Sequence, residues 1–309
     1  MAKRYYRKLA VLGKLEATYG VDAAPTGAAN AMRMTDVQFS PMEGQEVPHE
    51  SLLPYLGHQG VELAGLYARL EGSIEVAGAG AAGTAPAYGP LLRACGMAET
   101  ITAATKVSYD PVSTGFEAAS LYFNADGVRH VLLGARGTCT VNLTPNQIPR
   151  FRFNLMGLLG TISDQALPTV DHAGFVKASV VNKQNTVMSL HGWTAIAESL
   201  ALDLGNQVEM RFLVGDEGVE IVDRQSTGTF VVEAKSLATK NWFSIAKART
   251  RGALSAVHGT TAGNIVEFNA NQVEIGRPNQ GQTQGILNYS LPLMLCSGTG
   301  DDEMSIVVR

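Results

Sequence analysis

The chain has 309 residues, of which 45% are hydrophobic and 17% are charged. This composition excludes a mainly disordered protein, because enough apolar surface is present to bury a core, and the length indicates about two domains. Basic and acidic residues number 24 and 28, and no long basic stripe is present, which disfavours sequence-specific nucleic-acid binding. The charged fraction is below the roughly 25% of ordinary domains, so we expect partners to cover part of the surface.

The N-terminal segment 3–8 combines basic and aromatic residues. We expect it to be an arm that lies on a neighbouring subunit, because six residues give only a small footprint for nucleic acid. The apolar run 9–12 ends at Gly13, so no secretion signal is expected, and no apolar run approaches the roughly 20 residues of a membrane span. Residues 41–62 are predicted to form a long, irregular insertion whose apolar residues contact a partner.

Residues 72–77 alternate in the pattern of a strand, and residues 86–95 follow as a candidate helix that stops at Gly96. Between them, residues 78–83 match G-x-G-x-x-G, the pattern of a dinucleotide-binding turn. The prolines and glycine that crowd the following helix, at 86, 89 and 90, are wrong for that site. We therefore interpret 78–83 as a flexible Gly/Ala loop.

Residues 139–143 and 150–155 are the clearest pair of strands. A short connection rich in Pro and Asn joins them, which predicts a hairpin. Its inward side chains are expected to be Val141, Leu143, Phe151, Phe153 and Leu155. Strands of this kind dominate the chain, which predicts a mainly β fold.

The second half repeats the order of elements seen in the first. A strand at 228–234 precedes a candidate helix at 241–249, and residues 265–273 match 140–148 in their strand face and in an Asn-Gln turn. We infer a divergent duplication with a boundary near 164–171, so that modules 1–165 and 166–309 follow in tandem. Near the end, 289–295 alternates, and Pro292 predicts an edge or a bulge there.

No arrangement of residues points to catalysis, a cofactor or a metal, so we expect no enzyme. Cys95, Cys139 and Cys296 lack CxxC spacing. The six histidines form no metal-binding pattern, and the serines form no G-x-S-x-G elbow. The acidic run 301–303 is interpreted as a solvated loop rather than a cation site.

Residues 12–32, LGKLEATYGVDAAPTGAANAM, and the segment PMEGQE that begins at Pro41 carry a resemblance to a known family. The run resembles the opening of tail tube proteins of long, non-contractile-tailed bacteriophages. That resemblance implies β-sandwich modules, each with a flanking helix, in subunits that close into rings. The rings stack into a tube in the virion tail, which is assembled in the host cytoplasm, and viral DNA leaves through its bore.

If the resemblance holds, the lumen should be polar and poor in unpaired basic residues, because DNA must slide through it. The polar strand faces supply the candidates, which are Ser73, Glu75, Thr140, Asn142, Thr229, Glu233, Glu267 and Asn269. Arg150 and Arg152 depart from this pattern and are expected at an interface or on the outer surface.

Two modules per chain imply that three chains supply the six modules of a pseudo-sixfold ring. The insertion 41–62 would reach the adjacent ring and the N-terminal arm would reinforce that contact. The expected contact residues are Arg4, Tyr5, Tyr6, Arg7, Pro48, Pro54, Tyr55 and Leu56. The expected partners are further copies of the chain, the tape measure, terminator and tip proteins, and transiently the DNA, with no membrane.

Three other classes of protein are alternatives to a tail tube protein. A bacterial secretion-system tube has a related fold, but its subunits usually hold one domain. A carbohydrate-binding or adhesin sandwich would present aromatic residues over a groove, and only Trp193 and Trp242 are available as tryptophans. An oxidoreductase would depend on the glycine loop alone.

Overall fold

The computed structural model describes residues 3–309 as a mainly β protein in which three helices are all short. The helices are α1 (Gly27–Asn30), α2 (Gly89–Ala94) and α3 (Trp242–Ala248). The strands as far as residue 164 are β1 (Leu9–Leu15), β2 (Ala31–Met32), β3 (Thr35–Pro48), β4 (Val61–Glu75), β5 (Met97–Thr102), β6 (Lys106–Pro111), β7 (Ala119–Ala125), β8 (Val128–Leu143), β9 (Arg150–Leu159) and β10 (Ser163–Asp164).

The remaining strands follow residue 185 and complete the same hydrogen-bonded network, apart from one separate hairpin, β14–β15. They are β11 (Thr186–Leu190), β12 (Trp193–Thr194), β13 (Ala197–Asp203), β14 (Asn206–Leu213), β15 (Asp216–Arg224), β16 (Thr227–Glu233), β17 (Gly252–His258), β18 (Val266–Ile275), β19 (Asn279–Thr283), β20 (Ile286–Leu295) and β21 (Ser305–Val308). The prediction that strands dominate is confirmed.

One layer of antiparallel strands runs through both halves of the chain, and we call it the long layer. Its order is β3, β4, β9, β8, β13, β16, β20, β19. The two halves meet where β8 pairs with β13, from Leu143 opposite Leu200 to Thr140 opposite Asp203. Backbone hydrogen bonds therefore continue across the boundary between the halves.

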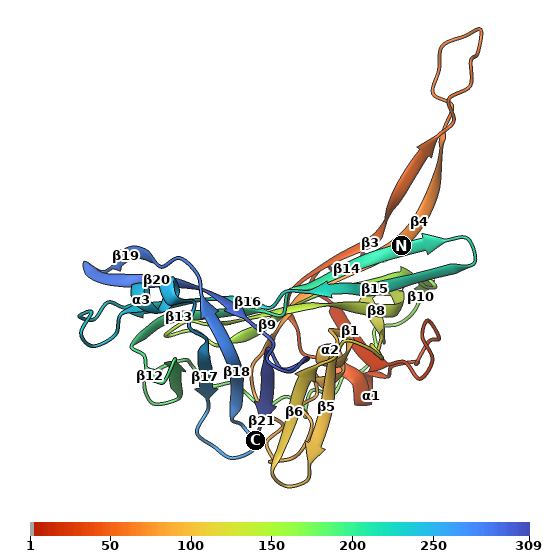
Figure 1. Cartoon of the computed structure of the whole chain (residues 1–309). Helices are drawn as coiled ribbons and strands as arrows, with labels where there is room; N and C mark the ends of the chain where they lie inside the picture. Colours follow the sequence, from red (N-terminus) through yellow and green to blue (C-terminus); the bar gives the residue numbers. More distant parts are fainter. Residues whose placement is uncertain (1–2) are drawn as a thin grey trace.

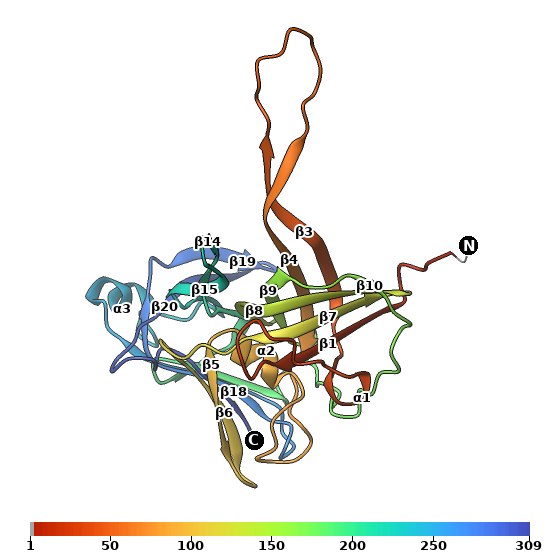
Figure 2. The ribbon, with the colours of Figure 1, turned by 90° about the vertical axis from the view of Figure 1, so that its right-hand side faces the viewer.

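A second layer lies beneath the first and also joins the halves (Figure 1). Its order is β12, β11, β17, β18, β21, β6, β5, and the halves meet where β21 pairs with β6. Strands β2, β1 and β7 extend the sheet from the N-terminal part of β8. The β3–β4 hairpin rises away from both layers in two perpendicular views (Figures 1 and 2).

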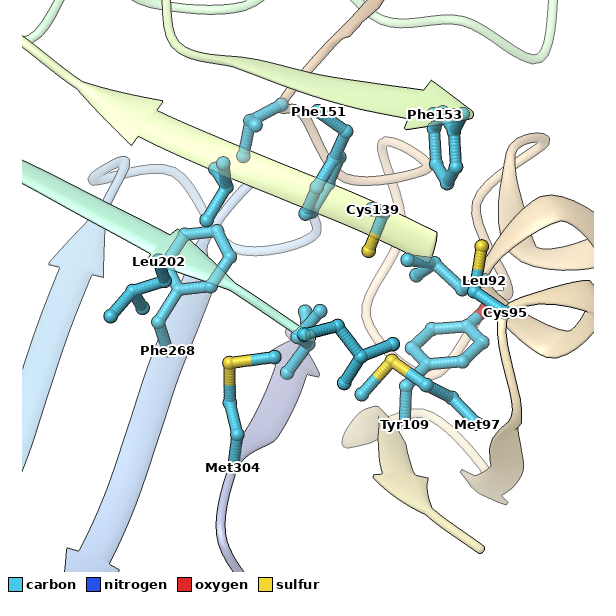
Figure 3. Packing of buried hydrophobic residues seen from close by; sticks show 14 of the residues in the cluster. Leu92, Cys95, Met97, Tyr109, Cys139, Phe151, Phe153, Leu202, Phe268 and Met304 are labelled. Atoms are coloured by element: carbon cyan, nitrogen blue, oxygen red, sulfur yellow. The ribbon is translucent and has the colours of Figure 1, made fainter. Parts of the chain in front are cut away.

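The hydrophobic core lies between the layers and draws on both halves (Figure 3). The hairpin prediction for β8–β9 is confirmed, since its five expected inward side chains are buried. Alternation explains this burial, because successive side chains of a strand point to opposite faces. Phe151 of the first half and Phe268 of the second are both fully buried, with ring centroids 5.8 Å apart.

Replacement of Phe268 by alanine is expected to lower the free energy of unfolding by about 3–5 kcal/mol, because it leaves a cavity against Phe151. Urea unfolding followed by circular dichroism would measure the loss. Ile101, exposed on the edge strand β5, is the control, and its replacement by alanine should change the value by less than about 0.5 kcal/mol. Equal losses for the two variants would contradict the packing described here.

Both predicted helices are present where a strand leads into them. α2 follows β4 and ends before Gly96, whose φ is +76°, a left-handed conformation that glycine adopts without strain. α3 follows β16, and its N-cap Asn241 accepts a hydrogen bond from the Ser244 N–H. The strand–helix order thus occurs twice, as expected.

One local prediction was wrong, and of the edge or bulge predicted at Pro292 only the edge is excluded. Asn271–Gln272 was expected to form a turn like the one between β8 and β9, but it lies inside β18. The pairing of β18 with β17 is irregular at this point, between Gly252 and Leu254 of β17. Strand β20 is not an edge, because β16 pairs with it on one side and β18 and β19 on the other. Pro292 is tolerated because it faces the gap between β18 and β19, where its carbonyl accepts from the Gly276 N–H at 2.8 Å.

Candidate assembly and lumen surfaces

The long layer presents one face to the core and a polar face away from it. In the pairing register Ser73 lies opposite Arg152, which lies opposite Thr140. Residues directly opposite each other share a face of the sheet, and the same holds for the neighbouring row through Glu75 and Asn142. This polar face carries six of the lumen candidates, which are Ser73, Glu75, Thr140, Asn142, Thr229 and Glu233.

The structure does not bring the other two lumen candidates onto this face. Glu267 and Asn269 lie in the part of β18 that pairs with β17 and β21 in the second layer. Glu267 forms an ion pair with Arg309, and Asn269 accepts a hydrogen bond from Ser255. Their strand alternates as expected, but only the tertiary fold decides which layer a strand joins.

Arg150 and Arg152 lie on the polar face, contrary to the expectation that they are kept apart from the lumen candidates. They are even-numbered residues of β9, opposite Asn142 and Thr140. Their charges are compensated, since Arg150 pairs with Asp36 at 3.3 Å and Arg152 with Glu71 at 2.7 Å. A face with paired arginines offers a phosphate backbone less attraction than one with free arginines.

Two further ion pairs neutralise basic groups around this face. Arg33 pairs with Glu75 at 3.2 Å, and Lys235 pairs with Glu233. Both acids are themselves lumen candidates, so their negative charge is partly used within the chain. The face is therefore polar and close to charge balance.

The two outer strands of the long layer each have one free edge. Among residues 3–309, β3 pairs only with β4, and β19 pairs only with β20. All five residues of β19 are exposed. An exposed edge with unpaired N–H and C=O groups is a template for pairing with another chain.

The segment 41–62 is not an irregular insertion, and that prediction was wrong. It consists of the outer arms of the β3–β4 hairpin, paired from Gln45 opposite Ala64 to Pro48 opposite Val61, with an irregular tip only at 49–60. Cross-strand hydrogen bonds maintain the arms without a core beneath them. At the tip, Leu52 and Leu56 are fully exposed.

The expected contact residues of this segment are all exposed. Pro48 ends β3, while Pro54, Tyr55 and Leu56 lie in the tip. An exposed apolar group of this size at the end of a long hairpin is characteristic of a contact site.

The N-terminal segment is held partly against its own chain. Arg4 pairs with Asp164 at 3.0 Å, and the Tyr5 N–H donates to Asp126. Tyr6 and Arg7 remain exposed. The four expected contact residues of the arm thus lie beside the β7–β8 turn, with their outer surfaces open.

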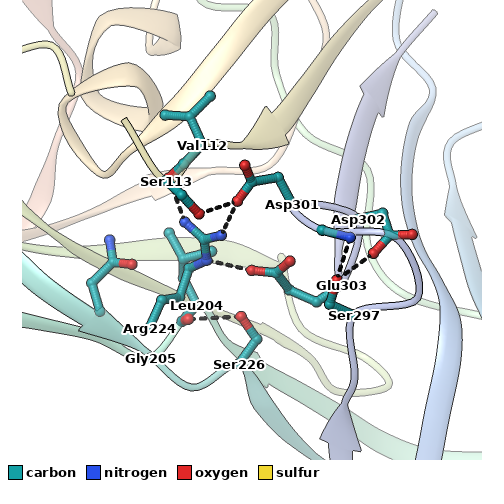
Figure 4. A network of polar contacts seen from close by, with 12 residues as sticks. Val112, Ser113, Leu204, Gly205, Arg224, Ser226, Ser297, Asp301, Asp302 and Glu303 are labelled. Atoms are coloured by element: carbon teal, nitrogen blue, oxygen red, sulfur yellow. Dashed lines mark hydrogen bonds and ion pairs between the residues drawn. The ribbon is translucent and has the colours of Figure 1, made fainter. Parts of the chain in front are cut away.

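The acidic run 301–303 is not a freely solvated loop; it belongs to an ion-pair network (Figure 4). Arg224, which is 10% exposed in its side chain, pairs with Asp301 at 2.9 Å and with Glu303. It also donates to the Val112 carbonyl at 2.7 Å. The network therefore connects the end of β15 to the first half and to the segment before β21.

Hydrogen bonds from Ser113 and the guanidinium of Arg224 lower the pKa of Asp301 below its usual value. A lowered folded-state pKa adds stability above the unfolded pKa of about 4, and this stability is lost as the pH falls through the folded-state value. We expect urea midpoints to fall between pH 5 and pH 3, and to fall less in an Asp301→Asn variant. An identical pH dependence for both proteins would contradict this assignment.

The glycine loop 78–83 is held in place rather than free. The Gly78 N–H donates to Asn264 at 2.7 Å, and the Gly80 N–H donates to the Gly263 carbonyl at 2.9 Å. A side chain at Gly78 would collide with that carbonyl, which explains the need for glycine. Within the described residues no group of three or more His, Cys, Asp or Glu side chains could hold a metal ion.

The three cysteines are free thiols; Cys95 and Cys139 are buried, and Cys296 is half-buried. No helix among residues 3–309 has both the length and the apolar character needed to cross a bilayer.

A family model described as "Phage tail tube protein" matches residues 7–293. The chain belongs to the phage tail tube protein family. No curated protein matches it. This tail tube protein is accordingly a structural component of a bacteriophage tail, in a family that is not enzymatic.

Sequence reasoning missed three features of the tail tube protein. The free edge at β19 escaped notice because its residues, NQGQT, show no apolar alternation. The β3–β4 arms lack a buried face, so the period of two had no hydrophobic signal. The Arg224 network joins residues that are 77 and 79 positions apart, and spacing alone cannot reveal such pairs.

Proposed function

We propose that this protein assembles with itself into stacked rings that form the tail tube, through which DNA is ejected. The observation that carries the proposal is the long layer, which has a charge-compensated polar face and ends in free edges at β3 and β19. Pairing of β19 in one copy with β3 in the next continues the sheet around an axis. Such head-to-tail contacts close into a ring when the rotation allows it.

The polar face is the proposed lumen surface, with Glu75, Thr140, Asn142, Thr229 and Glu233 lining the bore. Ser73 lies in the same row of the sheet but is buried. Paired arginines on this face are compatible with DNA passage, because an unpaired row of them would hold the phosphates. Glu267 and Asn269 are left out of the proposed lining because they belong to the second layer.

We propose two tandem β-sandwich modules, 1–165 and 166–309, and a trimeric, pseudo-sixfold ring. The support is the repeated connectivity: in each half a hairpin returns through a strand, β4 or β16, that pairs with the last long strand, β9 or β20, and leads into a helix. Three chains then supply six such modules.

Stacking of rings is assigned to the tip of the β3–β4 hairpin with Pro48, Pro54, Tyr55 and Leu56, and to the arm with Arg4, Tyr5, Tyr6 and Arg7. Tape measure, terminator and tip proteins are the proposed further partners, and assembly takes place in the host cytoplasm. A secretion-system tube would use the same edges, but it usually has one module per chain.

A carbohydrate-binding sandwich is disfavoured by the tryptophans. Trp193 and Trp242 pack edge to face with ring centroids 5.6 Å apart, and Trp242 is buried. Sugar-binding platforms need an exposed ring face, and the buried Trp242 offers none.

Electron cryo-microscopy of the purified protein tests the proposal. We expect tubes with a regular axial repeat, three copies in each ring, and Thr140 and Asn142 facing the bore. Six copies per ring would overturn the trimer, and a lone monomer at high concentration would overturn the proposed function itself.

A further inference from the structure

The chain contains its own example of a hairpin seated on a neighbouring half. Strands β13 and β16 pair from Ala197 to Asp203, and the pairing resumes beyond a break as β14–β15. This second stretch lies against the first half: the Val219 N–H donates to the Tyr19 hydroxyl at 2.6 Å, and Ile221 packs beside Gly96. The hairpin thus extends past the β8–β13 junction and covers the end of α2.

An ion pair also holds the β14–β15 hairpin against the first half. Arg136, whose side chain is 9% exposed, donates to Glu220 of β15 and to the Val219 carbonyl, both at 2.8 Å. The basic group belongs to the half that is covered, and the acidic group belongs to the hairpin. Asn206 adds a hydrogen bond to the Cys95 carbonyl at the last turn of α2, at 2.6 Å.

The β3–β4 hairpin occupies the equivalent position in the first half. Phe212 of β14 packs against Gly65 at the base of its outer arms, but beyond that point, in 44–48 and 61–64, the arms are exposed. Its inner part, 35–40 with 69–73, joins the long layer, as β13 and β16 do. The outer arms, 43–48 and 61–67, extend beyond the layer and are mostly exposed. The outer end of the β3–β4 hairpin is thus not packed against any surface of the described chain.

The second half has a surface that corresponds to the one covered by β14–β15, at the end of α3, but no hairpin of residues 3–309 covers it. α3 ends at Arg249 in a left-handed conformation, φ +51°, as α2 ends before the left-handed Gly96. α3 contacts β18, just as α2 contacts β8. In the described part of the chain, Lys247 and Arg249 at the end of α3, and Arg277 after β18, are exposed and have no ion-pair partner.

Hairpin and seat carry opposite charges. Residues 41–66 contain four acidic residues, Glu43, Glu46, Glu50 and Glu62, and no Lys or Arg. Residues 235–251 contain five basic residues and no Asp or Glu. Lys235 and Arg251 pair with Glu233 and Glu274, which leaves Lys240, Lys247 and Arg249 without an acidic partner among the described residues. This is the polarity of the internal seat, with the acid on the hairpin and the base on the covered half.

The two surfaces cannot meet within one molecule, because α3 and the β3–β4 hairpin lie on opposite sides of it (Figure 1). We infer that the outer arms of the β3–β4 hairpin seat on the basic end of α3 in a second copy within the same ring. This inference rests on the proposed function. It adds a second contact between neighbouring subunits of a ring, beside the pairing of β19 with β3. The tip 49–60 is left free to extend toward the adjacent ring.

Charge reversal tests the contact. Glu46→Lys with Glu62→Lys is expected to raise the protein concentration needed for assembly at least about tenfold, because like charges then face each other. Lys247→Glu with Arg249→Glu should do the same. The four changes together should restore assembly to within about threefold. The control is Glu209→Lys with Glu217→Lys, two exposed acids of the β14–β15 hairpin, which should change nothing.

A crosslink distinguishes contacts within a ring from contacts between rings. Glu62→Cys and Arg249→Cys are introduced together with Cys296→Ser, and assembled protein is treated with a flexible bis-maleimide. We expect covalent products that stop at the number of copies in one ring. Products that continue beyond that number would place the contact between rings and overturn the inference.

Other outcomes are equally decisive. Tubes that tolerate both charge reversals, or that fail to recover when the reversals are combined, would overturn the lateral contact and leave the tube function standing. Unmodified protein that forms neither rings nor tubes would overturn the proposed function together with this contact.

Discussion

Replacement of Gln282 by proline is expected to leave the chain folded and to abolish its assembly into rings. Gln282 lies in β19, next to the closing pair Thr283–Ile286 of a two-residue turn. Hydrogen-bonded and non-bonded pairs alternate along such a hairpin, so the Gln282 N–H points away from β20 toward the free edge. Proline removes that donor without breaking a backbone hydrogen bond of the hairpin. It also removes the Gln282 Oε1 that accepts from the Gly285 N–H at 2.9 Å, a loss that an alanine at the same position shares.

Gly281 precedes the substituted position and has no Cβ, which limits the steric conflict that proline causes with its preceding residue. Size-exclusion chromatography and electron microscopy would measure assembly, and circular dichroism would measure folding. The matched control is Gln282→Ala, which removes the same side chain but retains the N–H and should assemble normally. Rings formed by the proline variant at wild-type concentration would exclude β19 from the subunit contact.

The second large effect is expected at Arg224. Replacement by methionine leaves the carboxylate of Glu303, 9% exposed in its side chain, without its partner. Breaking a buried ion pair from one side typically costs about 3–5 kcal/mol, because a charge stays buried without compensation. We expect the free energy of unfolding in urea at pH 7 to fall by that amount.

Adding Glu303→Gln to Arg224→Met should recover more than half of the loss, because the unpaired buried charge is then gone. Arg211, exposed on β14 and without an ion-pair partner within residues 3–309, is the control, and Arg211→Met should have little effect. If the double variant were no more stable than Arg224→Met, the loss would come from the Val112 hydrogen bond or from packing instead.

The sequence pattern was sufficient to predict an element where its strands have one apolar face. The β8–β9 hairpin was predicted with its inward residues because Phe151, Phe153 and Leu155 alternate with polar residues. The α3 helix was predicted at 241–249 because apolar residues, among them Trp242 and Ile245, share one side and basic residues lie in its last turn. Both signals come from residues within a few positions of each other, where backbone geometry alone relates side chains.

Prediction failed where the decisive neighbour is distant in sequence. The arms of the β3–β4 hairpin bury no face, so polar and apolar residues follow no period, and the pairing of Pro48 with Val61 was not foreseen. Arg150 was placed away from the lumen candidates by its charge, although strand register sets its face and Asp36 compensates it. The burial of Glu303 was likewise not predicted, because its ion-pair partner Arg224 is distant in the sequence.

The amino-acid order alone settled the β class, the twice-repeated strand and helix order and the likeness to tail tube proteins, because periodicity and short motifs are local properties. The three-dimensional fold decided which strands share a layer, which edges stay unpaired, and how the arginines of the polar face are neutralised. Those outcomes depend on hydrogen bonds and ion pairs between segments many residues apart, and only the folded chain brings these segments together.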